Sequence, residues 1–119
     1  MITGAFLAES AWVVDNKLNV SGGVLSRFAI GPDRLARFVL VVLTESEMCN
    51  SDHSVDLEIR PPDDDEPQHI QFAVPDSAIG QFPGFAFFEV EISMPVDGRW
   101  VFVVTGGVGA TSIPLCVIS

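Results

Sequence analysis

The sequence contains few basic residues for its length. Six Lys and Arg stand against sixteen Asp and Glu in 119 residues, which gives a formal net charge of −10. Nucleic-acid binding takes much of its affinity from basic side chains that displace counterions from phosphates. The charge therefore argues against DNA and RNA as partners, and it equally disfavours an anionic membrane surface.

The sequence also lacks the pattern of a secretion signal and that of a membrane-spanning helix. The opening MITGAFLAESAWVV has no basic n-region and is interrupted by Glu9 and Ser10, so it indicates a strand and not a secretion signal. No apolar run approaches the roughly 20 residues that cross a bilayer as a helix. We expect a cytoplasmic location.

Cysteine is scarce. Cys49 and Cys116 are the two cysteines of the chain. They could form a disulfide, but two cysteines without a leader are more typical of free thiols in a reducing compartment. We therefore expect both to be free.

Apolar residues, by contrast, are abundant. They make up 48% of the sequence, with β-branched and aromatic residues in the runs and Gly and Pro between them. This composition excludes disorder and favours strands over helices. We expect a single domain over residues 1–119, with part of its apolar surface covered by another subunit.

The stretch from Phe85 to Thr105 predicts a β-hairpin with a three-residue loop at Val96, Asp97 and Gly98. Such a loop ends in a residue with positive φ, which Gly98 adopts without steric penalty. The expected register gives one apolar face with three facing pairs: Met94 with Trp100, Ile92 with Phe102, and Val90 with Val104.

Other segments also show strand patterns. A small hairpin is expected around Asp15, Asn16 and Lys17, with Trp12 opposite Val20, and Gly22–Gly23 is expected to mark a change of sheet. The almost wholly apolar run Phe38–Leu43 predicts a central strand covered on both sides, with a short buried helix as the alternative. The remaining strands are expected at Ile2–Ala8, Val24–Ile30, Ser54–Arg60, His69–Val74 and Ala110–Ile118, with Pro114 at an edge or bulge. The predicted fold is all-β: a single antiparallel β-sandwich of about eight strands with immunoglobulin-like or related topology.

Three groups of polar residues are candidates for chemistry. Asp63, Asp64, Asp65 and Glu66, with Asp52 or Asp56, could offer oxygen ligands to Ca²⁺, but their spacing does not fit an EF-hand and a solvated turn is the alternative. Ser51, Asp52 and His53 have the residue types of a catalytic triad, although adjacent side chains point apart. Zinc ligation by Cys49, His53, His69 and Cys116 has little spacing support. No catalytic, cofactor or metal site is therefore predicted.

Aromatic residues supply the remaining candidates. Trp12 and Trp100 are expected in the core, with an aromatic binding patch as the alternative. The loop Pro75–Gly84 and its end place Ile79, Phe82 and Phe85 either over an open end of the sandwich or in contact with a partner. These three are the predicted partner-contact residues.

Two long stretches carry a family resemblance. FLAESAWVVDNKLNVSGGVLSRF and RFVLVVLTESEMCNSDHSVDLEIRPPDDDE, together with VDG at Val96–Gly98, resemble an uncharacterised bacterial family of small β-sandwich proteins, classed as a domain of unknown function. Where that family commonly has a third glycine and a tryptophan, this chain has Val24 and Leu25. The resemblance implies no activity, cofactor or catalytic residue.

These observations favour a non-enzymatic module that binds protein, as a homo-oligomer or as an accessory subunit. An acidic surface would suit a basic partner. The alternative is a small-molecule or carbohydrate-binding sandwich in which Trp12 or Trp100 stacks on the ligand. A hydrolase using Ser51, His53 and His69 is the third possibility.

Overall fold

The regular elements of this protein are all β-strands in the part of the chain that is described. A computed structural model describes residues 2–44, 54–73, 84–106 and 110–119. Its strands are β1 (Ile2–Ala8), β2 (Ser10–Val14), β3 (Lys17–Ser21), β4 (Arg27–Ala29), β5 (Leu35–Thr44), β6 (Ser54–Arg60), β7 (Gln68–Ala73), β8 (Gly84–Ser93), β9 (Gly98–Thr105) and β10 (Ala110–Ile118). The described residues include no helix that could cross a membrane.

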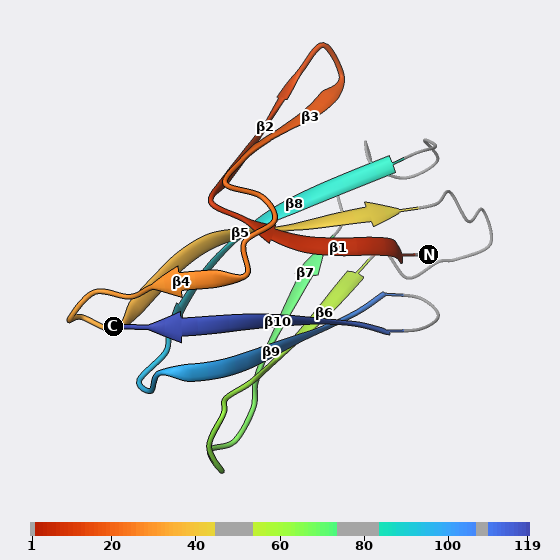
Figure 1. Cartoon of the computed structure of the whole chain (residues 1–119). Helices are drawn as coiled ribbons and strands as arrows, with labels where there is room; N and C mark the ends of the chain where they lie inside the picture. The colour runs from red at the N-terminus through yellow and green to blue at the C-terminus, as the bar shows by residue number, and fades with distance from the viewer. Residues whose placement is uncertain (1, 45–53, 74–83, 107–109) are drawn as a thin grey trace.

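The strands form three sheets (Figure 1). One sheet has the order β1-β5-β8, a second has the order β4-β10-β9-β6-β7, and β2 and β3 form a separate hairpin. The all-β prediction is confirmed. The finer prediction of one antiparallel sandwich of about eight strands is not what is observed, because the described residues form ten strands and β4 runs parallel to β10.

The hydrophobic core lies between the two larger sheets. Alternate residues of β5 and β8 enter it from the three-stranded sheet, and alternate residues of β6, β9 and β10 enter it from the five-stranded sheet. Phe38 of β5 meets Phe102 of β9 edge to face, with ring centroids 5.5 Å apart. The largest fully buried side chains are Trp100, Phe102, Leu7, Leu40, Leu57, Ile59, Met94 and Leu115.

Strand β5 is central, as the run Phe38–Leu43 predicts. It pairs with β1 on one side and with β8 on the other. All five residues from Phe38 to Val42 are buried, so both faces of the strand are covered. This confirms a strand and removes the helix alternative.

The predicted hairpin of Phe85–Thr105 is wrong in its pairing. Strand β8 pairs with β5, whereas β9 pairs with β6 and β10 in the other sheet. Gly98 does have a positive φ, +134°. Residues expected to face each other within one sheet, such as Ile92 and Phe102, are instead both buried in the core from different sheets.

The reason lies at the connection between β8 and β9. The N–H of Met94 donates to the carbonyl of Arg34 (2.9 Å), and the Arg34 Nε donates to the carbonyl of Met94 (2.9 Å). These bonds hold the end of β8 on the β4–β5 connection, away from β9. An apolar alternation looks the same whether two strands are neighbours or face each other across a core, so the pattern could not distinguish the two arrangements.

Other pairings agree with the sequence. The strands expected at Ser54–Arg60 and His69–Val74 are present as β6 and β7 and pair as an antiparallel hairpin. Pro114 lies on β10 opposite Val101 of β9, beyond the short stretch Cys116–Ile118 that pairs with β4, so it occupies a local edge as expected. The predicted strand Val24–Ile30 is shorter in the structure, spanning Arg27–Ala29.

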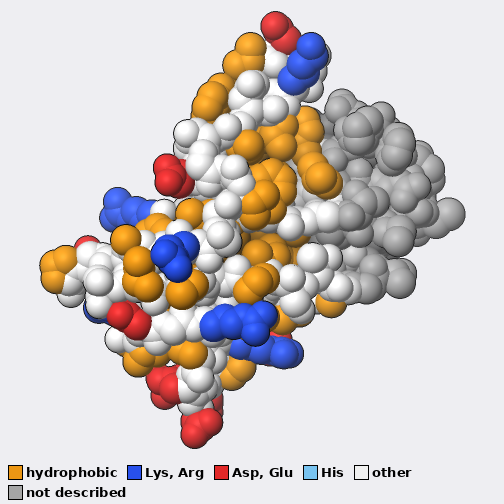
Figure 2. Space-filling model, viewed as in Figure 1, with side chains coloured by type: hydrophobic (Ala, Val, Ile, Leu, Met, Phe, Trp, Pro, Cys, Tyr) orange, Lys and Arg blue, Asp and Glu red, His pale blue; other side chains and the backbone are white. Residues whose placement is uncertain are grey.

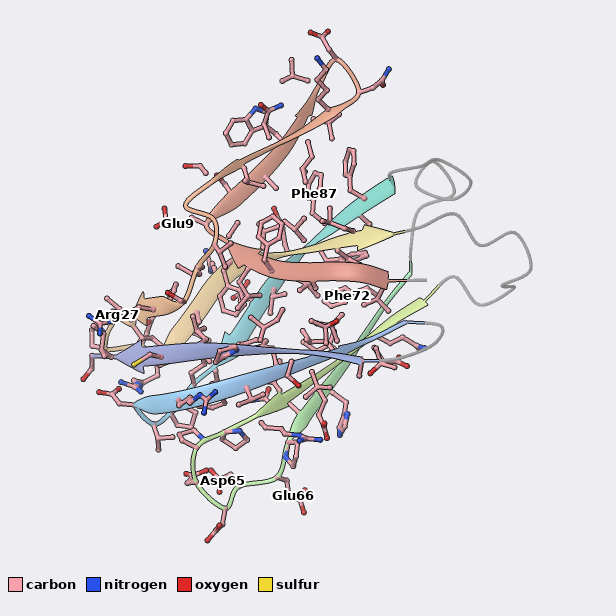
Figure 3. The ribbon with its side chains drawn as sticks, turned by 45° about the vertical axis from the view of Figure 1, so that its right-hand side comes forward. Glu9, Arg27, Asp65, Glu66, Phe72 and Phe87 are labelled. Carbon is pink, nitrogen blue, oxygen red and sulfur yellow. The ribbon has the colours of Figure 1, made fainter. Side chains whose placement is uncertain are left out.

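The edge between β7 and β8 is closed by contacts between the two sheets. Phe72 of β7 stacks on Phe88 of β8 with ring centroids 4.6 Å apart, and the side chain of Gln68 donates to the carbonyl of Ser93 (3.3 Å). Phe72 of β7 is labelled in Figure 3. These contacts tie the five-stranded sheet to the three-stranded one along that edge.

Asp97 joins three segments that are distant in sequence. Its Oδ1 lies 2.9 Å from Nη2 of Arg34, and its Oδ2 accepts hydrogen bonds from the hydroxyl (2.8 Å) and the backbone N–H (3.1 Å) of Ser119. The Ser119 hydroxyl, and after it Arg34, lower the pKa of the Asp97 carboxyl below its ordinary value. The ionised carboxylate is therefore the form that the folded state prefers.

Removing this charge should change how stability depends on pH. Because the pKa of Asp97 is lowered in the folded state, its contribution is full above the pKa of the unfolded chain and is lost as the pH falls through the folded pKa. We expect Asp97→Asn to lower Tm at pH 7, and the difference from the parent to shrink below about pH 4. Thermal unfolding followed by circular dichroism at a series of pH values measures this.

The matched control is Asp64→Asn, which removes the same charge from an exposed turn distant in sequence from Arg34 and Ser119. It corrects for the general effect of lowering the net negative charge. A Tm difference for Asp97→Asn that is as large at pH 3 as at pH 7 would contradict the assignment.

Candidate interaction surface

The β2–β3 hairpin is built on a two-residue turn. Asp15 and Asn16 both have positive φ, 52° and 60°, which is the pattern of the type I′ turn that matches the twist of a hairpin. Asp and Asn tolerate this conformation better than other residues with a side chain. Lys17 therefore pairs with Val14 and belongs to β3.

This turn corrects the predicted register by one residue. The sequence pattern predicts a loop of Asp15, Asn16 and Lys17 with Trp12 opposite Val20. In the structure Trp12 pairs with Asn19, and Val20 pairs with Ala11. The two-residue turn signal of Asp15-Asn16 would have given this register, because φ > 0 at both turn positions excludes the longer loop.

The register separates the hairpin into two faces. Cross-strand partners share a face, so one face carries only apolar residues: Ala11, Val13, Leu18 and Val20. The opposite face is mixed and carries Ser10, Trp12, Val14, Lys17, Asn19 and Ser21.

Four large hydrophobic residues of the hairpin are exposed, two on each face. The exposed fractions are 45% for Trp12, 48% for Val13, 50% for Val14 and 38% for Val20. We call these four residues the hairpin surface. Figure 1 shows the hairpin projecting from the two larger sheets, and Figure 2 shows hydrophobic side chains along it.

The root of the hairpin is fixed to the body. The N–H of Glu9 donates to the carbonyl of Ser21 (3.0 Å) and closes the base of the hairpin. The N–H of Leu25 donates to the carbonyl of Leu7 of β1 (2.7 Å) and ties the returning chain to the three-stranded sheet. The chain passes from the hairpin to β4 of the five-stranded sheet through Gly22–Gly23, which confirms the change of sheet expected there. The exposed tip therefore extends from an anchored base.

The outer face of the three-stranded sheet continues this apolar region. Val39 and Val41 of β5 point away from the core by strand alternation and are nevertheless buried. On β8, Phe85 and Phe87 lie on the same outer side and are half-buried. Figure 3 shows Phe87 between β8 and the hairpin.

Of the three predicted partner-contact residues, only one can be placed. Phe85 lies at the start of β8, on the outer face of the three-stranded sheet. Ile79 and Phe82 lie outside the described residues. The sequence does not predict the hairpin surface, because it favours the core for Trp12 and leaves an aromatic binding patch as the alternative.

The hairpin differs in charge from the rest of the molecule. Asp15 and Lys17 are the charged residues between Ser10 and Ser21, and their charges cancel, whereas the whole chain carries −10. Apolar surface without net charge is the kind that protein interfaces bury at their centre.

A polar cavity lies near the root. Its volume is about 400 Å³, and its lining consists of Glu9, Arg37, Phe38, Val39, Glu89, Val90 and Glu91. Arg37 and Glu91 form an exposed ion pair across it at 3.4 Å. Figure 3 shows Glu9 where β1 passes into β2.

The residues considered for chemistry are not brought together in the described part of the chain. His69 is exposed and its Nε2 lies 3.9 Å from Oε1 of Glu58. Cys116 is a half-buried free thiol. Cys49, Ser51, Asp52 and His53 lie outside the described residues. Where residues are described, no group of three or more His, Cys, Asp or Glu side chains is arranged to hold a metal ion.

The acidic turn Asp63–Glu66 is exposed and stabilised from within. The N–H of Asp65 donates to Oδ1 of Asp63 at 3.1 Å. Figure 3 shows Asp65 and Glu66 at the tip of the β6–β7 connection. The solvated-turn interpretation accounts for this geometry.

The two tryptophans have opposite environments. Trp100 is 1% exposed and its indole N–H donates to the carbonyl of Val96 at 3.0 Å, so the core prediction is confirmed for this residue. For Trp12 the core prediction is wrong. The corrected register places it on the face with Ser10 and Asn19, where solvent reaches it.

Comparison with protein-family models, with curated protein sequences and with solved structures gave no match. The family resemblance of the opening segment and of the Arg37–Glu66 segment therefore stays a prediction.

The contrast between the tryptophans predicts a two-component fluorescence signal. Acrylamide should quench the emission of Trp12 readily and that of Trp100 poorly, because only the first indole is accessible. Trp12→Phe should leave a blue-shifted emission that resists quenching, while Trp100→Phe should leave a red-shifted, quenchable one. Equal quenching of both single-tryptophan proteins, each shown to be folded by circular dichroism, would contradict these environments.

Proposed function

We propose that this protein is a non-enzymatic module that binds protein through its hairpin surface, as a homo-oligomer or as an accessory subunit. In this proposal the three-stranded and five-stranded sheets act as a β-sandwich scaffold, related to immunoglobulin-like domains only in having two sheets face one core. The scaffold holds an anchored hairpin away from the body. Its role is to present apolar side chains to a partner.

One observation carries the proposal. Four large hydrophobic residues are between 38% and 50% exposed on one short, projecting hairpin with no net charge. Full burial of a side chain such as valine is worth about 1.5–3 kcal/mol relative to full exposure, and each of these half-exposed side chains forgoes roughly half of its own burial free energy. A partner that covers the hairpin surface would recover part of this free energy.

The electrostatics suggest which partner would be favoured. The hairpin surface is neutral, but the molecule around it is strongly acidic. If the module acts as an accessory subunit of a different protein, a partner with an apolar centre and a basic rim would gain both from burial and from faster association. Nucleic acid would gain neither.

Two isosteric substitutions test the proposal. Val13→Thr with Val20→Thr replaces a methyl by a hydroxyl at each site and keeps β-branched residues that suit a strand. We expect this double variant to keep the Tm of the parent within a few degrees and to lose its partners. The measurement is comparative capture from a lysate together with sedimentation velocity of the purified chain.

The matched control is Val24→Thr, which makes the same chemical change at a residue that is 68% exposed but lies outside the hairpin. It should retain every partner that the parent binds. Unchanged capture and unchanged sedimentation for the hairpin variant would contradict the proposed function.

A small-molecule-binding role is the second candidate. Two observations favour it: Trp12 is exposed enough to stack on a ligand, and the cavity beside Glu9 and Arg37 has the size of a small-molecule site. Trp100 is removed as a platform because it is buried. A soluble saccharide or cationic small molecule that binds here should change the fluorescence emission of Trp12 or should bind more weakly to the Glu89→Gln variant. A panel of such compounds that shows neither effect would contradict this role.

A further inference from the structure

We propose that the hairpin takes a second copy of this chain as its partner, and that the β3 strands of the two copies pair antiparallel about Asn19. The two hairpins then form one four-stranded sheet with the order β2-β3-β3-β2. This inference rests on the proposed function and names its partner.

The open edge of β3 is the first reason. The Asp15-Asn16 turn makes Val14 and Lys17 the closing pair of the hairpin, and hydrogen-bonded pairs alternate with non-bonded pairs along the ladder. The backbone N–H and C=O groups of Leu18 and Val20 consequently point away from β2. No strand among the described residues pairs with β3 on that side.

The edge of β2 is less open. The root of β2 packs next to β5, whereas β3 has no comparable strand beside it except β2 in the described part of the chain. An unpaired strand edge is a template for another strand. Of the two edges of the hairpin, that of β3 is therefore the one we assign to the second copy.

The side chains of β3 fit a two-fold axis through Asn19. Antiparallel pairing about this residue places Leu18 opposite Val20 of the second copy and Lys17 opposite its Ser21. No charged residue then faces one of like charge. The apolar faces of both hairpins become continuous on one side of the new sheet, which doubles the face formed by Ala11, Val13, Leu18 and Val20.

Charge favours this part of the surface for contact between copies. Two molecules of charge −10 repel each other, and the repulsion is smallest where the contacting segment is neutral. In Ser10–Ser21 the charges of Asp15 and Lys17 cancel. The remaining repulsion comes from more distant carboxylates and is screened by salt, so association should strengthen as ionic strength rises.

The hairpin itself gains from the pairing. A two-stranded sheet is marginally stable on its own in water, and three or more strands with an apolar face are stable. A symmetric pair satisfies the open backbone groups of both copies with one contact. Dimerisation would therefore stabilise each hairpin as half of a four-stranded sheet.

Cysteine cross-linking tests the register. In a background of Cys49→Ser and Cys116→Ser, Asn19→Cys places two thiols on the two-fold axis, where facing non-bonded residues have Cα atoms about 4.5 Å apart. That distance suits a disulfide. We expect mild oxidation to give the covalent dimer, and to give it faster at high salt than at low salt.

Two control cysteines locate the contact. Lys17→Cys would lie roughly 14 Å from its symmetry mate, four residues along the strand at about 3.4 Å each, so its cross-linking should be slower by more than an order of magnitude. Trp12→Cys lies at the centre of β2 and reports pairing through the other edge. Preferential cross-linking at position 12, or equal rates at positions 17 and 19, would overturn the β3 pairing.

The unmodified chain gives a test that needs no variant. Sedimentation equilibrium over a thousandfold dilution should show a monomer–dimer equilibrium that shifts to dimer with added salt. A monomer at every concentration overturns the inference. If the chain is monomeric but the Val13→Thr and Val20→Thr double variant no longer captures the partners of the parent from a lysate, the proposed function stands without the dimer. If the double variant captures the same partners, both the dimer and the proposed function are contradicted.

Discussion

The contact between the two larger sheets is the interaction on which the rest of the structure depends. Phe38 and Phe102 meet edge to face at its centre, and Trp100, Leu40 and Leu57 are fully buried beside them. Each such side chain contributes about 1.5–3 kcal/mol when removed from water. Strand β5 belongs to this contact, β1 pairs with β5, and the N–H of Leu25 ties the chain that leaves the hairpin to Leu7 of β1.

The hairpin lies outside this core, and different interactions determine its structure. Its ladder and its two-residue turn define its shape, and two backbone hydrogen bonds at the root, from Glu9 and from Leu25, close its base and tie the returning chain to β1. Its apolar residues are covered only in part by the rest of the chain. A surface of this kind is stable when a rigid scaffold supplies the folding free energy and the surface itself supplies binding.

The sequence predicts where the strands lie better than it predicts which strands pair with each other. The alternation of Ser54–Arg60 and the apolar run Phe38–Leu43 gave the right strands, since burial on one or both faces leaves a periodic trace. The pairing of Val90 with Val104 was wrong because that trace is the same for strands beside each other and for strands across a core. Trp12 was misplaced by a one-residue register slip, which exchanges the two faces of a strand. The candidate surface was missed for that reason.

Hydrogen exchange of the backbone amides, followed by mass spectrometry at low and high protein concentration, tests the central claim most directly. If the hairpin is an interaction surface on a rigid core, the amides of Ser10–Ser21 exchange fast in dilute protein. Their exchange slows when the protein concentration is raised or a captured partner is added, while the amides of β5 and β9 stay protected throughout. If instead Ser10–Ser21 is as protected as β9 in the dilute monomer, the hairpin is already part of the core and the account is contradicted.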